Sequence, residues 1–455
     1  MRTQLVLASL CLSSVALAED PPAPPALPAP GQPVAAPPAA APPVVAPPPH
    51  AAEPAAPPHH AADHHKPKPK WYEKLAIRGY AQVRYNRLGS DLGLFGEKND
   101  RYTSPLGDKS IARGNSFSIR RARLIVQGDV TDHVFVYVQP DFSNTIGDAT
   151  HYLQMRDFYA DVAVDKKKEL RFRIGQSKVP YGWENMQSSQ NRLPLDRSEP
   201  INSGAPGERD LGVFAYYAPA SRRALLKRLV DDGLKGSGDY GVLAFGVYNG
   251  QGANQVEKNN SRHVVARVSY PFEVGGQILE AGVAGYYGKV VVPLGTGANV
   301  PRIGDASGRD VNNLKDMRAQ AAFVLYPKPV GFQAEYNVGK GPETREGVMK
   351  ARSLWGGYGM VTAKIGDFMP FVRYQQYHGG RKSETNAPTS RVSEIEPGVE
   401  WQPDKGFELT LSYAYGRRTC VAESKDQTSC GYNSVKAGST GVTGQMLRIQ
   451  AQFNY

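Results

Sequence analysis

One short segment of the sequence, LRFRIG, alternates strictly between apolar and charged side chains, and this pattern constrains the fold strongly. Leu170, Phe172 and Ile174 fall on one face of an extended strand, and Arg171 and Arg173 fall on the other. A soluble sheet would bury the apolar face in a core. A membrane barrel would turn that face to lipid and place the arginines in a wet lumen.

The same alternation recurs along the chain. In residues 118–130, Arg121 and Arg123 alternate with Ala122 and Leu124, and the last nine residues, LRIQAQFNY, alternate throughout. A soluble edge strand as long and regular as this last one would be an aggregation hazard. In a closed barrel it would pair with the first strand and leave no free edge. The alternation therefore favours a transmembrane barrel.

The connections between the predicted strands alternate between short and long. Short ones contain DKKKE, FEVGG, PKPVG, IGD and QPDKG. Long ones are predicted at residues 86–115, 251–261, 289–316, 339–352, 378–390 and 417–443. Short turns on one side and long loops on the other are typical of bacterial outer-membrane barrels. This spacing predicts an all-β fold, a transmembrane antiparallel β-barrel of about sixteen strands, a size that leaves an aqueous channel. Residues 219–239 depart from the rule, and LLKRLV predicts a brief helix there.

The chain divides into three predicted parts. Residues 1–18 form a signal peptide with a basic start, an apolar core and an Ala-Leu-Ala site, with cleavage after Ala18. Residues 19–70 form a disordered arm rich in Pro, Ala and His, which lies in the periplasm as a polyproline linker. Its clustered histidines are explained better by a solvated spacer than by a metal site. Residues 71–455 form the barrel, in the bacterial outer membrane.

Composition narrows the partners. The 24 tyrosines suit aromatic girdles and the 47 glycines suit tight turns. The first 70 residues hold four basic and four acidic side chains, so the whole net charge of +11 lies beyond Lys70. With arginines on strands and an export signal, this excess indicates small anions as partners and argues against nucleic acid. No metalloprotease motif, nucleophile elbow or phosphate-cradling glycine loop occurs, so no enzyme activity and no cofactor or metal are predicted.

Five motifs follow one another in a specific order within residues 115–215. They are the RRARL strand, the FYADV strand, G-x-x-K-x-P-Y-G, a pair of serines and GERDLGVF. In this order they resemble the phosphate-selective porin O and P family. The resemblance implies a sixteen-stranded outer-membrane porin, usually a homotrimer, whose third external loop folds into the lumen. It also implies wall arginines that attract anions and a lysine cluster that selects phosphate or polyphosphate.

Residues 178–209 correspond to that inward loop, and they differ from the family pattern. The family's selectivity lysines have no residue-by-residue match in this loop, which offers Gln190 and Arg192 rather than a lysine cluster, and its basic and acidic side chains balance. The predicted anion pathway comprises eight side chains on the wall and in the loop: Arg121, Arg123, Arg171, Arg173, Lys178, Arg192, Arg197 and Arg209. The alternative for the wall arginines is ordinary lumen polarity, with pairing to Asp157, Asp161, Glu394, Glu396 and Glu400.

The sequence leaves several functions open. The leading hypothesis is a porin for passive uptake of small anions, with phosphate or polyphosphate as the expected solutes. Alternatives are a weakly selective general porin whose arm, residues 19–70, tethers the barrel to the cell wall, and a hydrolase embedded in a barrel. Outer-membrane lipid and lipopolysaccharide are expected to surround the barrel. Cys420 and Cys430 fall in one external loop, where an oxidising compartment favours a disulfide over two free thiols.

Overall fold

The computed structural model describes residues 70–89, 116–146, 149–205, 209–296, 300–304, 312–419 and 442–455. All described residues lie in one compact unit, Pro67–Tyr455. The signal peptide and most of the arm predicted for residues 1–70 therefore lie outside the described residues.

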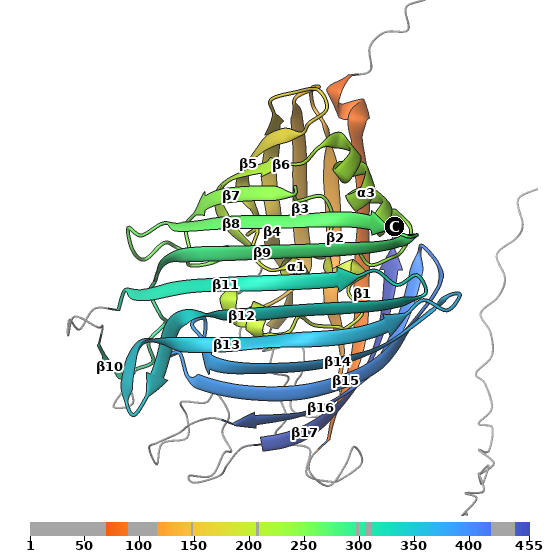
Figure 1. Ribbon diagram of the computed structural model, residues 1–455. Coiled ribbons are helices and arrows are strands. Elements are labelled where there is room, and N and C mark those ends of the chain that lie inside the picture. The colour runs from red at the N-terminus through yellow and green to blue at the C-terminus, as the bar shows by residue number, and fades with distance from the viewer. Residues whose placement is uncertain are drawn as a thin grey trace, which may run out of the picture. The chain divides into compact units, whose positions relative to one another are not determined.

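Sixteen antiparallel strands form one closed barrel, and Figure 1 shows β5 to β17 following one another around its wall. The barrel strands are β1 (Leu75–Gly89), β2 (Ser116–Asp129), β3 (Val134–Ile146), β4 (Ala149–Ala163), β5 (Leu170–Lys178), β6 (Arg209–Tyr217), β7 (Leu243–Tyr248), β8 (His263–Val274), β9 (Gln277–Val290), β11 (Leu314–Leu325), β12 (Val330–Arg345), β13 (Val348–Ala363), β14 (Phe368–Gly380), β15 (Thr389–Asp404), β16 (Phe407–Thr419) and β17 (Val442–Asn454). A two-residue strand, β10 (Arg302–Ile303), pairs in parallel with β13. The predicted fold class and strand number are confirmed.

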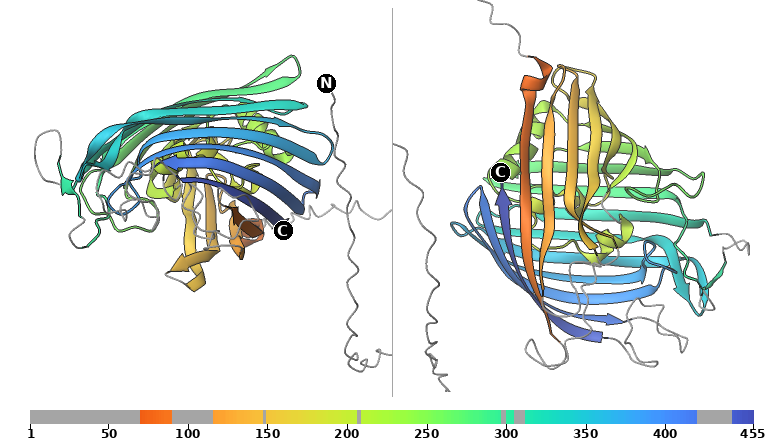
Figure 2. Two further views of the ribbon diagram at one scale, coloured as in Figure 1. Left: turned by 90° about the horizontal axis from the view of Figure 1, so that it is seen from below. Right: turned by 180° about the vertical axis from the view of Figure 1, so that it is seen from behind.

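The first and last strands close the barrel. β1 pairs with β2 on one side and with β17 on the other, in a register that runs from Tyr80 opposite Asn454 to Gly89 opposite Gln445. The right-hand view in Figure 2 shows β1 in orange beside the dark blue β17. Because every strand then has two neighbours, the described barrel wall has no free edge.

Five short helical segments accompany the strands: η1 (Trp71–Lys74), α1 (Trp183–Met186), η2 (Ser189–Asn191), α2 (Glu199–Gly204) and α3 (Ala220–Asp231). Residues 71–74, the first of the predicted barrel part, form η1, and β1 begins at Leu75. The helix predicted from LLKRLV is confirmed as α3. None of the described helices is long and apolar enough to span a membrane.

Alternation sorts the side chains between the outer face and the lumen. Phe172 and Ile174 are 40% and 52% exposed, whereas Arg171 and Arg173 are 7% and 4% exposed. The same division holds on β17, where Ile449 is exposed on the outer face. The register predicted for these strands is therefore confirmed.

The two ends of the barrel differ, as predicted. One end, called the turn end here, carries the short connections 130–133, 164–169, 275–276, 326–329, 364–367 and 405–406 and the longer connection 218–242. The opposite end, called the loop end, carries the long connections. The long loop predicted at residues 339–352 is wrong, because β12 and β13 continue to a two-residue turn. Glu346 and Gly347 both have positive φ angles, 53° and 66°, which is the geometry of a tight hairpin turn.

Candidate functional site in the barrel lumen

Loop 3, defined here as residues 179–208 between β5 and β6, folds inward rather than projecting from the barrel. Figure 1 shows its helix α1 behind the strands of the near wall. The backbone turns inward at Gly182, where φ is 82°. A Cβ atom at this position would lie 3.0 Å from Cδ1 of Ile201 and 3.1 Å from Oε1 of Glu335. Glycine therefore allows both the positive φ and the close approach to the wall.

Two wall carboxylates hold the start of loop 3. The backbone N–H groups of Trp183 and Glu184 donate to the two carboxylate oxygens of Glu335 on β12, at 2.7 and 2.9 Å. The Trp183 indole N–H donates to Glu280 on β9 at 3.0 Å. These three hydrogen bonds attach α1 to the barrel wall at β9 and β12, so the position of α1 in the lumen is well defined.

Asp196 of loop 3 lies among three arginines. Its carboxylate is 2.9 Å from Nη1 of Arg84, 3.3 Å from Nη2 of Arg120 and 2.6 Å from Nη1 of Arg448. Burial alone would raise the pKa of Asp196, but the charges of Arg84, Arg120 and Arg448 hold it well below its ordinary value. The ionised carboxylate of Asp196 therefore contacts three guanidinium groups at once.

Arg120 is a member of this group that alternation alone does not predict. The pairing of β1 with β2 shifts between Gln82, opposite Arg121, and Val83, opposite Ile119, so Arg120 has no partner position on β1. Such a β-bulge re-aims side chains locally. It explains how Arg120 and Arg121, which are adjacent in sequence, both lie near Asp196. The sequence shows this irregularity only as two adjacent arginines, Arg120 and Arg121, which interrupt the alternation of basic and apolar residues.

A second carboxylate extends this arginine group along the wall to β14 and β15. Glu396 on β15 accepts from Arg448 at 2.9 Å and from Arg373 at 2.7 Å. Arg373 also reaches Glu184 of loop 3 at 3.1 Å. The wall and loop 3 are thus joined by a continuous chain of ion pairs.

Four of the eight side chains predicted for the anion pathway form ion pairs with carboxylates. The pairs are Arg123 with Asp141 (2.8 Å), Arg171 with Asp239 (2.7 Å), Arg173 with Asp161 (2.7 Å) and Arg209 with Asp157 (2.8 Å). The pairing with Asp157 and Asp161 is the alternative that the sequence left open, although the arginine that meets Asp157 is Arg209. These four arginines are spread along β2, β5 and β6 and do not gather at one point.

The other four have different surroundings. Arg121 is buried and donates to Gln82 at 2.7 Å, and it makes no ion pair within the part of the chain that the structure describes. Lys178 donates to the backbone carbonyls of Met186 and Gln187 at 3.1 and 2.7 Å. The carbonyl of Gln187 is also 3.4 Å from Nη2 of Arg192.

Arg197 also bonds within loop 3. It donates to the side-chain oxygens of Asn185 at 2.5 Å and Asn202 at 2.8 Å. Lys178, Arg192 and Arg197 therefore support the loop's own fold, whereas Arg121 belongs to the arginine group around Asp196.

A second segment narrows the lumen from the turn end. Leu225, Leu226 and Leu229 of α3 pack with Trp183 of loop 3 in one apolar cluster. After the helix, the backbone carbonyl of Lys235 accepts from the Gln187 side chain at 2.7 Å.

Where loop 3 meets this segment, a cavity of about 20 Å³ remains. That is room for about one water molecule. Loop 3 and the connection 218–242 therefore pack directly against each other inside the barrel.

Cys420 and Cys430 lie outside the described residues, so the predicted disulfide stays a prediction.

The sequence model described as "Phosphate-selective porin O and P" matches residues 100–455. No curated protein sequence matches the chain.

The chain is similar to solved structures of outer-membrane proteins at low sequence identity. The outer-membrane channel DcaP of Acinetobacter baumannii has 13% identity and a TM-score of 0.50, covering 84% of this chain and 97% of that one. OmpF of Salmonella typhi, solved with daunomycin, has 13% identity and a TM-score of 0.49, covering 84% and 97%. The trimer form of OmpT from Vibrio cholerae has 10% identity and a TM-score of 0.48, covering 84% and 99%.

Proposed function

The chain belongs to the phosphate-selective porin O and P family and forms an outer-membrane channel, and we propose that this channel prefers anions and admits small ones such as phosphate or polyphosphate by passive diffusion. The arginine group around Asp196 is the observation that carries the proposal. Arg84, Arg120 and Arg448 share this one carboxylate. A narrow passage with low-dielectric walls focuses the field of such charges and raises the local concentration of anions.

Arg121 strengthens this local field. Its guanidinium group is buried beside Gln82 and has no carboxylate partner among the described residues. Arg123, Arg171, Arg173 and Arg209 contribute less to the field in the lumen. Each is paired with a carboxylate, which cancels most of the arginine's charge at a distance. Selectivity for anions is therefore assigned to the part of the wall where β1, β2 and β17 face loop 3.

The proposal extends to assembly and location. The family resemblance supports a homotrimer, with the turn end and the arm of residues 19–70 on the periplasmic side. It also supports export by a signal peptide that is cleaved after Ala18. Sizing of the purified protein in detergent and sequencing of its mature N-terminus test these two points.

Reversal potentials in planar bilayers test the selectivity. Under a gradient of potassium chloride, the wild-type channel should give a zero-current potential of anion sign, and the sign should persist in potassium phosphate. The double variant Arg120→Gln, Arg121→Gln should shift that potential toward zero, because two lumen charges are lost while the buried pairs of Arg84 and Arg448 are kept.

Lys166→Gln, Lys167→Gln is the matched control. It removes the same charge from an exposed turn, where salt screens it, so its potential should equal that of the wild type. A wild-type zero-current potential of cation sign would refute the proposal. An equal shift of the potential in both variants would show that the arginines near Asp196 do not determine the selectivity.

A further inference from the structure

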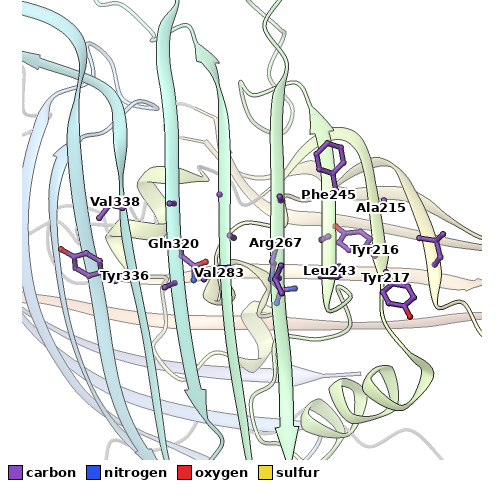
Figure 3. A pocket seen from close by; sticks show the side chains of 18 residues that line it. Ala215, Tyr216, Tyr217, Leu243, Phe245, Arg267, Val283, Gln320, Tyr336 and Val338 are labelled. Carbon is purple, nitrogen blue, oxygen red and sulfur yellow. The ribbon is translucent and has the colours of Figure 1, made fainter.

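The outer face of the barrel has a hollow of about 730 Å³ that crosses strands β6 to β12 (Figure 3). Its floor consists of small outward-facing residues in one row across the strands. The register places Ala266 opposite Gly285, Gly285 opposite Ala319, and Ala319 opposite Val338. At the other end of the row Phe245 stands opposite Ala266. The hollow exists because its floor is formed by glycine and alanine, while larger side chains such as Phe245 and Val338 stand at its two ends.

The neighbouring row of side chains, nearer the turn end, is apolar as well. Leu243 stands opposite Val268, Val268 opposite Val283, and Ala321 opposite Tyr336. Leu243, Val283 and Tyr336 are exposed. On a barrel in a membrane these positions face hydrocarbon, so the hollow opens to the acyl chains of lipid.

Three exposed lysines lie on the same outer face, beyond the hollow toward the loop end. Lys289 on β9 and Lys315 on β11 stand directly opposite each other. Lys340 on β12 stands opposite Met317, which is opposite Tyr287. None of the three lysines makes an ion pair within the described part of the chain.

Two like charges directly opposite each other destabilise an antiparallel pair. The acidic residues of these strands point the other way, since Glu280, Asp316 and Glu335 are buried in the lumen. The three lysines therefore form an uncompensated positive patch, and an anionic partner would relieve its repulsion.

The spacing matches an outer-leaflet lipid. Lys340 is two residues beyond Val338 of the hollow, or about 7 Å, and Lys289 is four residues beyond Gly285, or about 14 Å. Tyr287 lies between the hollow and Lys289, and outward tyrosines of this kind mark the membrane–water interface. The lysines are thus at the level of lipid headgroups on the loop end, which faces the outside in such barrels.

We propose that this surface binds one phosphorylated, multiply acylated glycolipid of the outer leaflet, the chemistry of lipid A. An acyl chain fills the hollow, and the phosphates of the headgroup contact Lys289, Lys315 and Lys340. Both halves of the surface are needed to choose this occupant. Free inorganic phosphate would leave the hollow unfilled, and a second copy of the chain at the same face would bring more lysines to an already positive patch.

Titration of the full-length protein in detergent with diphosphoryl lipid A, read by native mass spectrometry, tests the proposal. The wild type should retain one copy in a saturable way and bind monophosphoryl lipid A more weakly. The triple variant Lys289→Gln, Lys315→Gln, Lys340→Gln should bind diphosphoryl lipid A about 100-fold more weakly. This follows from about 1 kcal/mol per lysine near an anionic lipid surface and tenfold per 1.4 kcal/mol.

Two further variants separate the contributions. Lys166→Gln, Lys167→Gln, Lys405→Gln removes three exposed lysines from the turn end and should keep the wild-type affinity. Ala266→Trp, Ala319→Trp fills the hollow and should reduce affinity about tenfold or more, since each acyl CH₂ that is no longer buried costs about 0.8 kcal/mol. The heat-dependent gel mobility of each variant verifies that its barrel is folded.

Three results would overturn the proposal. They are unsaturable lipid binding by the wild type, an equal loss of affinity in the turn-end control, and full displacement of the lipid by inorganic phosphate. The last result would assign the lysines to a free anion. Channel selectivity is measured separately, so failure here leaves the proposed function untouched.

Discussion

Arg173 shows how a side chain of the lumen wall is held. Its guanidinium group makes two hydrogen bonds to Asp161, at 2.7 and 2.8 Å, and lies 3.8 Å from the centroid of the Tyr159 ring. A bidentate pair of this kind fixes both distance and orientation, and stacking on the ring adds a cation–π attraction. The pair is buried, so removing one partner leaves the other charge without compensation.

We expect Arg173→Ala to destabilise the barrel by about 3–5 kcal/mol, the usual cost of breaking a buried ion pair. The double variant Arg173→Ala, Asp161→Ala should recover part of this loss, because no unpaired charge remains. The temperature at which the folded gel mobility is lost gives both values. If the double variant is as unstable as the sum of the single ones, the two side chains do not interact.

A second expectation concerns acid. Asp239, which lies between α3 and β7, would have its pKa raised by burial, but the charge and hydrogen bonds of Arg171 lower it to about 2. A carboxyl group whose pKa is lower in the folded state than in the unfolded state stabilises the folded protein. This contribution is fully present at pH values above the unfolded-state pKa of about 3.9, and it is lost as pH falls through the folded-state pKa of about 2.

Asp239→Asn should therefore cost about 2.6 kcal/mol at neutral pH, because the pKa is lowered from about 3.9 to about 2 and each pKa unit corresponds to about 1.4 kcal/mol. The difference between variant and wild type should shrink between pH 4 and pH 2. Unfolding temperatures measured across this range test the expectation, and a difference that persists unchanged at pH 2 would contradict it.

Single residues also show what the sequence could predict. Alternation placed Arg171, Arg173, Phe172 and Ile174 on the correct faces, since direction along a strand follows from local geometry. It offered Asp161, the partner of Arg173, only as one of five candidate carboxylates, and it did not indicate Asp239 as the partner of Arg171. Asp239 is 68 residues from Arg171, and such pairings depend on the closure of the whole barrel. Arg120 was missed because a bulge breaks the period of two.

At the scale of elements, loop 3 and the connection carrying α3 occupy the lumen from opposite ends. The inward course of loop 3 follows from the family resemblance, and the helix of α3 from its own sequence. Their contact through Trp183, Gln187 and Lys235 follows from neither, because each segment's position depends on the wall that the other strands build.

Replacing residues 183–204 of loop 3 by a short Gly-Ser linker should increase single-channel conductance, because the segment that narrows the lumen is removed. It should also weaken anion preference, because a wider passage focuses the field of the wall arginines less, even though the carboxylate of Asp196 is lost as well. Planar-bilayer recordings measure both quantities. The matched control replaces residues 251–260 of the external loop that contains the 82% exposed Val256, and it should conduct like the wild type. Unchanged conductance in the loop 3 variant would show that the narrowest point lies elsewhere.

Strand ends were harder to predict than strands. Residues 339–352 contain Gly339, Gly341 and Pro342, which suggested a loop. In the structure they belong to the paired ends of β12 and β13, where Pro342 stands opposite Ala351. Cross-strand pairing overrode the local preference of these residues, as it commonly does in sheets.

At the scale of the whole molecule, the barrel contains the described ion pairs and apolar clusters within its own unit, Pro67–Tyr455. The proline-rich composition of residues 19–70 cannot bury enough apolar surface to form a core. Nothing in the contacts of the described residues therefore requires the arm for the barrel to fold.

Deleting residues 19–70 while keeping the signal peptide should leave an inserted barrel whose conductance and reversal potential match those of the full-length protein. Membrane fractionation and planar-bilayer recording test this. A truncated protein that does not reach the membrane would show that the arm assists folding or export. A truncated protein that inserts but has altered conductance would show that the arm enters the pore.

The pairing of β1 with β17 has a consequence for the order of biogenesis. The partner of β1 is β17, which follows all the other described strands in the sequence. Until β17 is in place, β1 has an unpaired edge. The backbone N–H and C=O groups of such an edge have no hydrogen-bond partners in hydrocarbon, which costs free energy. The barrel wall therefore loses its last free edges only when β17 pairs with β1, and sheet pairing and membrane burial of the wall are completed by the same contact.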